Sequence, residues 1–392
     1  MHQKKRIRSL FLSAWYPNRE DAMVGLFVRK HAEAVALQND VTVLYLHADP
    51  QISKFEIIKQ NINEHLHEII VYYPNHIRGT VGKFFKIINY FRANRLGNRE
   101  VKKDFRPDIV HVNVLTRTGL LAYWLKLTQG IPYVITEHWS RYFSDRNSYH
   151  GFFRKVLTKL IVKSASAVLP VSEGLKKAMK SHKLHNPNYQ VVNNVVDDFF
   201  FEKINQPAHN KIKQILHVSC FDDQVKNISG ILRATKSLSL IRNDFNLVIV
   251  GTGPDYDKIK SYADDLKFPQ DMILFTGELT PKEVATQFHQ ADFFVLFSNY
   301  ENSPVVISES LASGKPVIST DVGGIAEHVN QTNGILIPVG DENALLNAIL
   351  HMLENHQSYD AENTQGIAKQ KFSYKSVSNE INKIYSDIIY EV

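Results

Sequence analysis

The most informative part of this 392-residue sequence is Ser298–Pro316, which reads SNYENSPVVISESLASGKP. It follows the apolar run Phe293–Phe297, which is typical of a buried β-strand. We expect a helix from 304 to about 313, because Ser303 is a good N-cap residue and Pro304 suits the first helical position. A helix that starts at the carboxyl end of a strand lies where open α/β sheets bind their ligands.

The start of this expected helix is suited to an anion. The backbone amides of Val305 and Val306 have no partners within the helix, and they lie at its positive end. A phosphate group would bind favourably there. Gly314, which precedes Lys315-Pro316, is typical of a helix end.

Two glutamates, Glu301 and Glu309, lie on either side of the expected helix start. At a rise of ~1.5 Å per residue, Glu309 lies roughly 8 Å along the helix axis from the N-cap. The pair is therefore poorly placed to act from opposite sides of one glycosidic bond, as hydrolases require. It suits two contacts to one elongated ligand whose phosphates lie at the helix start. The alternative is that both glutamates are merely solvated on the surface.

Short apolar runs rich in β-branched residues alternate with segments of helical period along the chain. This alternation predicts an α/β protein with two parallel, doubly wound, Rossmann-like sheets, each covered by helices on both faces. The first sheet is expected from Ile7–Trp15, Val41–Leu46, Ile69–Tyr73, Ile109–Val112, Tyr133–Thr136 and Ala167–Pro170. The second is expected from Ile215–Ser219, Asn246–Val250, Met272–Thr276, Phe293–Phe297, Pro316–Ser319 and Gly334–Ile337.

Turn-forming residues and a polar linker at 206–210 indicate a domain boundary within 191–213. We expect an N-terminal domain at 1–192 and a C-terminal domain at 193–373. Residues 374–392 have a helical pattern of apolar side chains, so this helix must pack on another element. We expect it to pack back on the first domain.

The N-terminus joins basic residues to the apolar run Leu10–Trp15 and so resembles a short signal peptide. Because the run stops before Pro17 and no small-x-small cleavage site follows, we interpret it as the first strand. No run of about 18 apolar residues occurs, so no transmembrane helix is expected. A single cysteine, Cys220, rules out an internal disulfide and fits a reducing compartment. The expected location is therefore the cytoplasm.

Positive charge is concentrated in the first half of the chain. Residues 1–200 hold 30 Lys and Arg against 16 Asp and Glu, whereas residues 201–392 hold 16 against 24. Such an asymmetry indicates that one half meets an anionic surface or substrate, such as nucleic acid, anionic lipid or a pyrophosphate-linked acceptor. The alternative is that these side chains only keep that half soluble. A nucleic-acid partner is not expected, because no recognised binding motif occurs.

Two segments of the first half, Lys83–Arg92 and Phe152–Lys163, are basic and amphipathic. Each either lies on an anionic membrane surface or covers the first sheet with its basic face in water. We expect at most peripheral, reversible contact with the inner face of a membrane.

Several motifs in the second half, taken together, resemble those of the retaining glycosyltransferases of the GT-B fold, specifically family 4. Ser298–Pro316 resembles the Glu-x7-Glu signature of that family, and the likeness covers most of residues 190–345. Asn194–Asp197 resembles the Asn-Gly-Val-Asp with which the family's second domain begins, with Val195 in place of Gly. Val250–Pro254 resembles the family's Gly-x-Gly-Pro motif, and Phe275–Gly277 resembles the end of its next strand and the loop that follows. Ser319–Gly324 resembles its Asp-x-Gly-Gly loop. The resemblance implies two Rossmann-like domains that face each other across a cleft.

The resemblance also implies roles for individual residues of the second domain. Glu301 would contact the donor sugar at the catalytic centre, and Glu309 would bind the nucleotide ribose. The donor phosphates would be held by the helix start and by an Arg and a Lys after the first strand of this domain. Lys226 matches the lysine, but Cys220 or a neighbour occupies the arginine position, so this diphosphate site is incomplete. The other expected donor-binding residues are Ser303, Val305, Val306 and Gly277.

The first domain resembles the family at two positions. His138 follows the expected strand Tyr133–Thr136 and falls where the family has an active-site histidine near the donor sugar. Gly25 resembles the loop glycine between the first strand and the first helix. A missing side chain there would let backbone amides approach the pyrophosphate or sugar. Without the resemblance, a lone histidine is more often structural.

The implied activity is retaining transfer of a sugar from a nucleotide-sugar donor to a hydroxyl acceptor, with no metal and no cofactor. A helix N-terminus and Lys226 would stabilise the nucleoside diphosphate leaving group. The acceptor is expected to be a sugar or a lipid-linked sugar in surface polysaccharide or glycolipid biosynthesis. A GT-B epimerase or a phosphorylase-like enzyme is the nearest alternative. A nicotinamide dehydrogenase is disfavoured, because Tyr256 stands where the dinucleotide fingerprint needs its third glycine.

Overall fold

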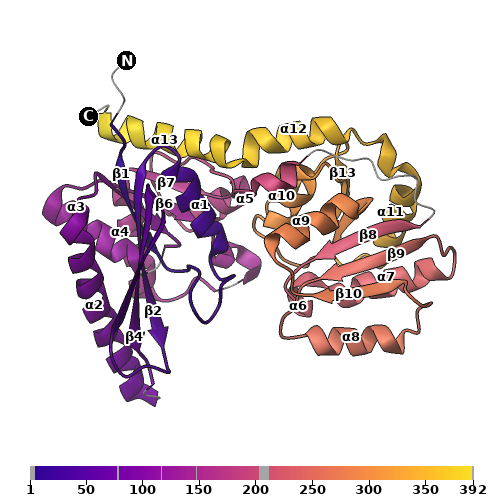
Figure 1. The fold of residues 1–392 in the computed structure, drawn as a ribbon, viewed down its shortest axis with the longest axis horizontal. Coiled ribbons are helices and arrows are strands. Elements are labelled where there is room, and N and C mark those ends of the chain that lie inside the picture. The colour runs from indigo at the N-terminus through magenta and orange to yellow at the C-terminus, as the bar shows by residue number, and fades with distance from the viewer. Residues whose placement is uncertain (1–4, 77–78, 116, 147, 203–211, 391–392) are drawn as a thin grey trace. The chain divides into compact units, whose positions relative to one another are not determined.

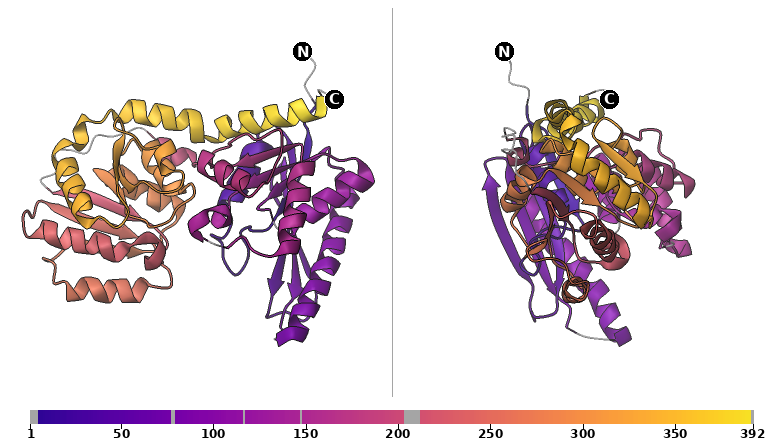
Figure 2. Two further views of the ribbon diagram at one scale, coloured as in Figure 1. Left: turned by 180° about the vertical axis from the view of Figure 1, so that it is seen from behind. Right: turned by 90° about the vertical axis from the view of Figure 1, so that its right-hand side faces the viewer.

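The computed structural model describes residues 5–76, 79–115, 117–146, 148–202 and 212–390. The chain divides into two compact units. Unit 1 comprises Met1–Val195 and Tyr374–Val392, and unit 2 comprises Val196–Ser373. Each unit has one β-sheet with helices on both of its faces (Figures 1 and 2). The division falls three residues after the expected boundary at 192/193. The segment 206–210, expected as a linker, lies outside the described residues.

The sheet of unit 1 has seven strands in the order β3-β4-β2-β1-β5-β6-β7. The N-terminal apolar run forms β1, which pairs in parallel with β2 on one side and with β5 on the other. This central place in the sheet confirms that the run is a strand. The strands are β1 (Arg8–Ser13), β2 (Asp40–Asp49), β3 (Glu56–Asn63), β4 (Leu66–Pro74), β5 (Ile109–Asn113), β6 (Tyr133–Glu137) and β7 (Ala167–Pro170).

One strand of the first sheet is not among the strands predicted from the sequence. β3 lies at the edge of the sheet and runs antiparallel to β4. Its side chains are almost all exposed, and the apolar residues Ile57 and Ile58 near its start are adjacent rather than alternating. Buried parallel strands are recognised by continuous apolar runs, which an exposed edge strand lacks. The sequence pattern therefore does not reveal β3.

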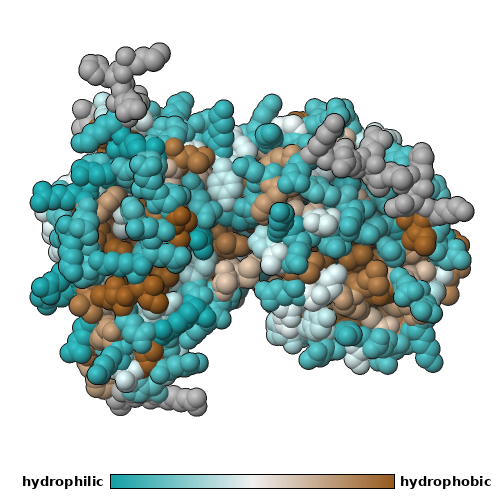
Figure 3. Space-filling model, in the orientation of Figure 1, coloured by the Kyte–Doolittle hydropathy of each residue, from teal (hydrophilic) through white to brown (hydrophobic). Residues whose placement is uncertain are grey.

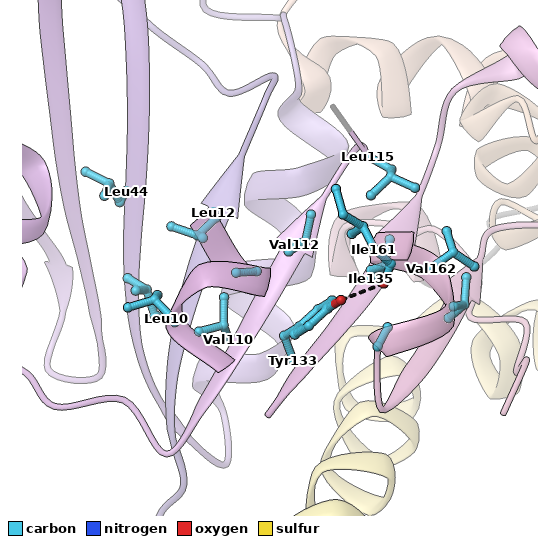
Figure 4. Close-up of a cluster of buried hydrophobic side chains, with 14 of the residues drawn as sticks. Leu10, Leu12, Leu44, Val110, Val112, Leu115, Tyr133, Ile135, Ile161 and Val162 are labelled. Atoms are coloured by element: carbon cyan, nitrogen blue, oxygen red, sulfur yellow. Dashed lines mark hydrogen bonds between the residues drawn. The ribbon is translucent and has the colours of Figure 1, made fainter. Parts of the chain in front are cut away.

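An apolar layer joins one face of this sheet to its helices. Leu10, Leu12 and Val112 of the strands pack in one cluster with residues of α3 and α4 (Figure 4). The Tyr133 hydroxyl donates a hydrogen bond of 2.5 Å to the Ile161 carbonyl within this cluster. The helices of unit 1 are α1 (Leu26–Ala36), α2 (Gly79–Asp104), α3 (Thr118–Gln129), α4 (Phe152–Ser164), α5 (Glu173–Ser181) and α13 (Tyr374–Tyr390).

The C-terminal helix α13 packs beside α1 on the other face of the sheet (Figure 1). Its apolar residues Val377 and Ile381 are buried there. The hydroxyl of Tyr385 lies 3.0 Å from Ser9 Oγ and 2.5 Å from His111 Nδ1. Because buried polar groups require partners, this network fixes α13 on the strands β1 and β5.

The two basic amphipathic segments form α2 and α4, and each helix covers the sheet of unit 1 with one face. Tyr90 of α2 and Ile161 of α4 are buried in the apolar layer. The outer faces are not purely basic, however, because Phe84, Phe152 and Phe153 are 63%, 76% and 86% exposed. Figure 3 shows apolar surface among polar side chains where α2 runs in Figure 1. Among the described residues, no helix has the length and apolar character needed to cross a bilayer.

The sheet of unit 2 has six parallel strands in the order β10-β9-β8-β11-β12-β13. All six expected strands are present, with bounds shifted by at most two residues. The strands are β8 (Lys213–Val218), β9 (Phe245–Val250), β10 (Ile273–Gly277), β11 (Phe293–Leu296), β12 (Val317–Thr320) and β13 (Gly334–Ile337). The helices are α6 (Asp223–Lys226), α7 (Ile228–Ser239), α8 (Tyr256–Asp265), α9 (Pro281–Gln290), α10 (Val305–Ala312), α11 (Glu342–Asn355) and α12 (Ala361–Phe372).

Each sheet reverses its strand order beside the first strand of its unit. In unit 1, β2 and β5 lie on either side of β1, and in unit 2, β9 and β11 lie on either side of β8. The loops that leave neighbouring strands diverge at such a point, and open α/β sheets bind their ligands there. The loops after β1 and β5, and those after β8 and β11, are therefore the expected binding positions.

Candidate active site

Two loops of unit 2 are joined where the strand order reverses. The short helix α6 follows β8, and the segment 297–304 follows β11. Asn299 connects them, since its backbone amide donates to the Val225 carbonyl at 2.8 Å and its side-chain amide donates to the Gln224 carbonyl at 3.0 Å. These bonds bring Lys226 and Glu301 together.

Lys226 and Glu301 form an ion pair, with 2.5 Å between Nζ and Oε1. Their side chains are only 17% and 9% exposed. The Ser298 hydroxyl donates a hydrogen bond of 2.8 Å to the same carboxylate oxygen. Water screens a pair with so little exposure less than it screens a surface pair. The residue predicted to contact the sugar and the residue predicted to bind the phosphates thus form one charged cluster.

Hydroxyl groups of the neighbouring strand β12 hold the segment that carries this cluster. Thr320 Oγ1 donates to the Ser298 carbonyl at 2.6 Å, and Ser319 Oγ donates to the Leu296 carbonyl at 3.0 Å. All four residues are buried. The end of β11 is therefore fixed by side chains as well as by the sheet.

The buried His217 of β8 also links strands at this site. Its Nδ1 donates to the Val295 carbonyl at 2.9 Å, so its Nε2 accepts from the Ser219 hydroxyl at 2.7 Å. Burial lowers the pKa of His217 to about 4. The imidazole is therefore neutral at neutral pH and serves to position β8 against β11.

The Asp-x-Gly-Gly loop after β12 packs against the backbone of the Glu301 segment. The Gly324 amide donates to the Asn302 carbonyl at 2.7 Å. Gly323 has a φ of +60°, and a Cβ at this position would lie 2.1 Å from the Glu301 carbonyl oxygen. Since only glycine fits here, the two loops approach closely enough to fix the position of Glu301.

The helix after Glu301 starts one residue later than expected. Pro304 is the N-cap of α10, with extended backbone angles (φ −68°, ψ 118°) and no side-chain cap hydrogen bond. The predictions of Ser303 as N-cap and of Pro304 as the first helical residue are therefore wrong. The fixed φ of proline fits both a cap and a helix, and only ψ distinguishes them. Val305 and Val306 are still the first two helical residues, so their amides lack acceptors within the helix.

Glu309 lies in the second turn of α10 and is only 8% exposed. The carboxylate of Glu301 is similarly covered. The alternative of two solvated surface glutamates is therefore wrong. The predicted contact of Glu309 with a ribose stays a prediction.

The arginine missing after β8 is not replaced by another arginine of unit 2. Cys220 is exposed in this loop, and partial burial of its thiol raises the pKa. Both arginines in 196–373, Arg233 and Arg242, form ion pairs with carboxylates elsewhere in the unit. Lys226 is thus the cation that the described residues of unit 2 provide next to Glu301.

The Gly-x-Gly-Pro motif after β9 makes room for the protein's own backbone. A Cβ at Gly251 would lie 1.9 Å from the Ser219 carbonyl oxygen, and a Cβ at Gly253 would lie 2.6 Å from the Phe221 amide nitrogen. These glycines therefore let the loop after β9 approach the loop after β8. Gly277 ends β10, and its carbonyl accepts a 2.8 Å hydrogen bond from the Gly251 amide. Its role in donor binding stays a prediction.

His138 belongs to unit 1, where it follows β6 in an aromatic environment. Its ring centroid lies 4.5 Å from that of Phe27 and 5.3 Å from that of His31. Burial, and then the neighbouring histidines, lower the pKa of His138 well below its ordinary value. The imidazole is therefore neutral at neutral pH, and its predicted contact with a donor sugar would be a hydrogen bond rather than an ion pair.

The fully buried carboxylate of Glu137 fixes the loop that carries His138. Its Oε1 accepts from the amides of His138 at 3.0 Å and Trp139 at 2.9 Å, and its Oε2 accepts from the Leu115 amide at 3.0 Å. Burial raises the pKa of Glu137, and the hydrogen bonds from the amides oppose that shift. Sequence reasoning missed this residue, although a charged side chain at the end of the apolar strand Tyr133–Glu137 was a usable signal.

Gly25 is the N-cap of α1 and has a left-handed conformation with φ +67°. A Cβ there would lie 2.4 Å from the carbonyl carbon of Trp15. The close contact between the two loops of unit 1 already requires glycine at this position. The expected approach of a pyrophosphate or sugar stays a prediction.

The described residues contain no group of three or more His, Cys, Asp or Glu suited to a metal ion.

Two family descriptions match the chain in sequence order. "Glycosyltransferase Family 4" matches residues 25–198, and "Glycosyl transferases group 1" matches residues 199–371. The two matches together span most of both units.

Three relatives illustrate the similarity in sequence. An uncharacterized glycosyltransferase of Methanocaldococcus jannaschii is 27% identical over 312 residues, 78% of this chain and 83% of that protein. The alpha-monoglucosyldiacylglycerol synthase of Streptococcus pneumoniae is 26% identical over 56% of this chain and 53% of that protein. A Campylobacter jejuni N-acetylgalactosaminyltransferase, whose name includes a diphospho-undecaprenol acceptor, is 27% identical over 54% of this chain and 57% of that protein. For the last two, the match covers little more than half of the relative.

Two solved structures show the similarity in fold. Sucrose-phosphate synthase from Thermosynechococcus elongatus has a TM-score of 0.78 at 18% identity and covers 99% of this chain and 100% of that chain. HepE from Anabaena, solved in complex with UDP, has a TM-score of 0.70 at 16% identity and covers 97% of this chain and 100% of that chain. Since these structures share the GT-B architecture and the two family descriptions match successive halves of the sequence, the chain belongs to the GT-B glycosyltransferases of family 4 and is a glycosyltransferase.

Proposed function

We propose that the protein transfers a sugar from a nucleotide-sugar donor to an acceptor hydroxyl, with retention of the anomeric configuration and without a metal or cofactor. The observation that carries this proposal is the ion pair between Lys226 and Glu301 at the reversal of strand order. The pair follows β8 and β11 in unit 2, and the first helical residues of α10, Val305 and Val306, come four and five residues after Glu301 in the chain.

The chemistry follows from the charges of this cluster. Departure of a nucleoside diphosphate leaves negative charge on the phosphate next to the sugar. Lys226 and the amides of Val305 and Val306 would stabilise that charge, because fixed donors and a helix dipole act strongly where little water is present. Glu301 would contact the donor sugar, and His138 would contact it as a neutral hydrogen-bond partner.

Thermal stabilisation by a panel of UDP-, GDP- and ADP-sugars tests donor binding. A ligand that binds the folded protein raises its stability as the concentration exceeds the dissociation constant. We expect a shift with one nucleotide class, with UDP-sugars tried first because HepE was solved with UDP. The shift should be lost in Glu309→Ala and kept in Glu362→Ala, which removes an exposed glutamate of α12. No shift with any donor, for folded protein, contradicts the proposal.

The configuration of the product and the need for a metal are tested in a transfer assay. The anomeric coupling constant of the product, measured by NMR, should show the same configuration as the donor sugar. Excess EDTA should leave the rate unchanged. A product of inverted configuration would contradict the retaining mechanism. Loss of activity in EDTA that a divalent cation restores would contradict metal independence. Interconversion of the nucleotide-sugar without transfer would favour the epimerase alternative.

The acceptor is proposed to be lipid-linked or a sugar chain of a surface polysaccharide or glycolipid. The names of the S. pneumoniae and C. jejuni relatives, which include diacylglycerol and diphospho-undecaprenol, support this choice. The exposed apolar and basic outer faces of α2 and α4 support reversible contact with an anionic membrane on the cytoplasmic side.

Co-sedimentation with vesicles tests the membrane contact. Vesicles of phosphatidylcholine with one third phosphatidylglycerol should bind the protein, and vesicles of phosphatidylcholine alone should not. The double variant Phe152→Ser and Phe153→Ser should lose most of this binding. The control Leu240→Ser and Ile241→Ser removes two residues of unit 2 that are 78% and 63% exposed. Equal loss of vesicle binding in both double variants would contradict a membrane-binding surface on α4.

A further inference from the structure

A cavity of about 670 Å³ lies within unit 1, where β1, β2 and β5 end. Trp15 and Leu115 line it from the loops after β1 and β5, and helices α2, α3 and α4 enclose it with Tyr90, Leu121 and Leu157. Most of its lining is therefore apolar or aromatic. This is the binding position that the reversal of strand order in unit 1 predicts.

The lining of the cavity includes a buried cation, Arg141, whose charge is not paired by an ion pair among the described residues. Arg141 is only 6% exposed, and among the described residues no ion pair or hydrogen bond of its guanidinium group is recorded. Its guanidinium packs on the ring of Trp139. A buried charge without a partner is costly, and an aromatic face offsets only part of that cost. The position of Arg141 therefore favours an anionic ligand.

The nearby carboxylate of Glu137 does not supply that anion. It acts on Arg141 electrostatically, but no hydrogen bond between the two is recorded in the described part of the chain. The oxygens of Glu137 accept three backbone amides instead. Glu137 thus holds the loop, and Arg141 keeps its hydrogen-bonding capacity.

The remaining charges of the cavity have the same sign. No aspartate or glutamate is found among the described lining residues. Burial is the main cause that lowers the pKa of Arg141, and repulsion from Arg154 contributes in the same direction. A ligand with more than one negative charge, such as a phosphate or diphosphate, matches this arrangement. The lysine and arginine side chains among the described lining residues are Lys86, Arg117, Arg141 and Arg154.

Exposed apolar side chains lie next to these cations in the sequence of the two enclosing helices. On α2, Lys86 stands between Phe85 and Ile87, which are 44% and 51% exposed. On α4, Arg154 follows Phe153, which is 86% exposed. Exposed apolar side chains on the helices that enclose a cationic cavity suit a ligand whose anionic head continues into an apolar chain.

We infer that this cavity of unit 1 is the acceptor site and that it binds a phosphate or diphosphate carried on an apolar chain, with Arg141 as the central anion-binding residue. The anion would lie against Arg141 and Arg154, and the chain would leave the cavity along the outer faces of α2 and α4. The identification of the ligand as the acceptor rests on the proposed function, whereas the preference for an anionic amphiphile rests on the cavity alone.

Calorimetric titration of the full chain with decyl phosphate, below the concentration at which it forms micelles, tests this inference. We expect binding that weakens at least tenfold in Arg141→Gln and in Arg154→Gln. Arg154 is exposed, so its variant is informative even if the Arg141 variant does not fold. Arg99→Gln, which removes an exposed arginine of α2 outside the cavity, should bind like the unaltered protein.

Two further ligands separate the parts of the inference. Decyl maltoside, which has the same chain without a charge, should bind more weakly than decyl phosphate. Inorganic phosphate should also bind more weakly. If inorganic phosphate binds as tightly as decyl phosphate, the apolar chain contributes nothing to binding, and the inference of an amphiphilic ligand is wrong. If both arginine variants bind decyl phosphate normally, the cavity is not the anion site.

Donor stabilisation measured on the same variants separates this inference from the proposed function. Nucleotide-sugar shifts should be retained in Arg154→Gln, because Arg154 lies in unit 1 and the donor cluster lies in unit 2. Failure of every donor to bind, with decyl phosphate binding still dependent on the arginines, would overturn the proposed function and leave the anionic site intact. If a donor binds but decyl phosphate binding does not depend on the arginines, the anionic site is overturned and the proposed function stands.

Discussion

The ammonium group of Lys226 lies 2.5 Å from the carboxylate of Glu301, although 75 residues separate them in the chain. The contact depends on Asn299, which ties the loop after β11 to the backbone of α6. In this arrangement each charge compensates the other. A donor diphosphate would then compete with Glu301 for Lys226 and leave the carboxylate available to the sugar.

Breaking this pair one residue at a time should show that the two charges are coupled. We expect Lys226→Gln and Glu301→Gln each to lower the free energy of unfolding by about 1–3 kcal/mol, because each leaves a nearly buried charge without its partner. The double variant should lose less than the sum of the two. Urea denaturation of the four proteins measures this, and additive losses would mean that the pair contributes nothing.

The same variants should be defective in transfer. Removing one group that stabilises developing charge typically costs about 100-fold to 1,000-fold in rate. We expect losses of that size in kcat/KM for Lys226→Gln and for Glu301→Gln, with the circular dichroism spectrum unchanged. A loss below about threefold in either variant would exclude that residue from the reaction.

The close approach of the loops after β11 and β12 should make Gly323 essential to the site. In Gly323→Ala, the new Cβ would lie 2.1 Å from the Glu301 carbonyl oxygen, so the Glu301 segment must move. Gly340→Ala is a matched control, because Gly340 also has a positive φ (+72°) and a Cβ there would meet no atom within 4 Å. Both variants carry the strain of a left-handed residue, about 1 kcal/mol. We expect only Gly323→Ala to lose donor binding and transfer, and equal activity of the two variants would contradict this explanation.

The sequence predicts the buried elements well and the exposed ones poorly. The strands of unit 2 are continuous apolar runs, so their bounds follow from local pattern. β3 escapes prediction because its edge position leaves it polar and exposed. The start of α10 is misplaced by one residue because proline is compatible with both an N-cap and a helix.

The site residues also differ in how far the sequence predicts them. The motif around Glu301 and Glu309 can be recognised from the sequence, because its residues lie close together in the chain. The contact between Lys226 and Glu301 depends on hydrogen bonds between two distant loops, which no local pattern contains. Arg141 cannot be recognised from the sequence, because its significance comes from burial in the tertiary structure with no ion pair or hydrogen bond of its guanidinium group among the described residues.

Stability of unit 2 should fall as the pH is lowered from about 6.5 towards 4, because of His217. Burial lowers its pKa to about 4 in the folded protein, whereas an unfolded histidine has a pKa near 6.5. The unfolded chain therefore binds more protons in this window, and each unit of pH costs about 1.4 kcal/mol for this group. Urea denaturation at pH 7, 6 and 5 should show a smaller slope in His217→Asn. The exposed His351→Asn should keep the full slope, and an equal change in both variants would contradict the assignment.

Replacing Cys220 should show whether the missing arginine limits donor binding. Cys220 is exposed in the loop after β8, and both arginines of unit 2 are paired elsewhere. In Cys220→Arg, a guanidinium group would add charge-assisted hydrogen bonds to a diphosphate near Lys226. We expect the dissociation constant for the nucleoside diphosphate, measured by calorimetry, to fall about tenfold, which corresponds to ~1.4 kcal/mol. Cys220→Ser should leave it unchanged, which separates the added charge from the loss of the thiol. Unchanged or weaker binding in Cys220→Arg would show that the donor phosphates do not approach this loop, and the diphosphate site would then have to lie at the start of α10 alone.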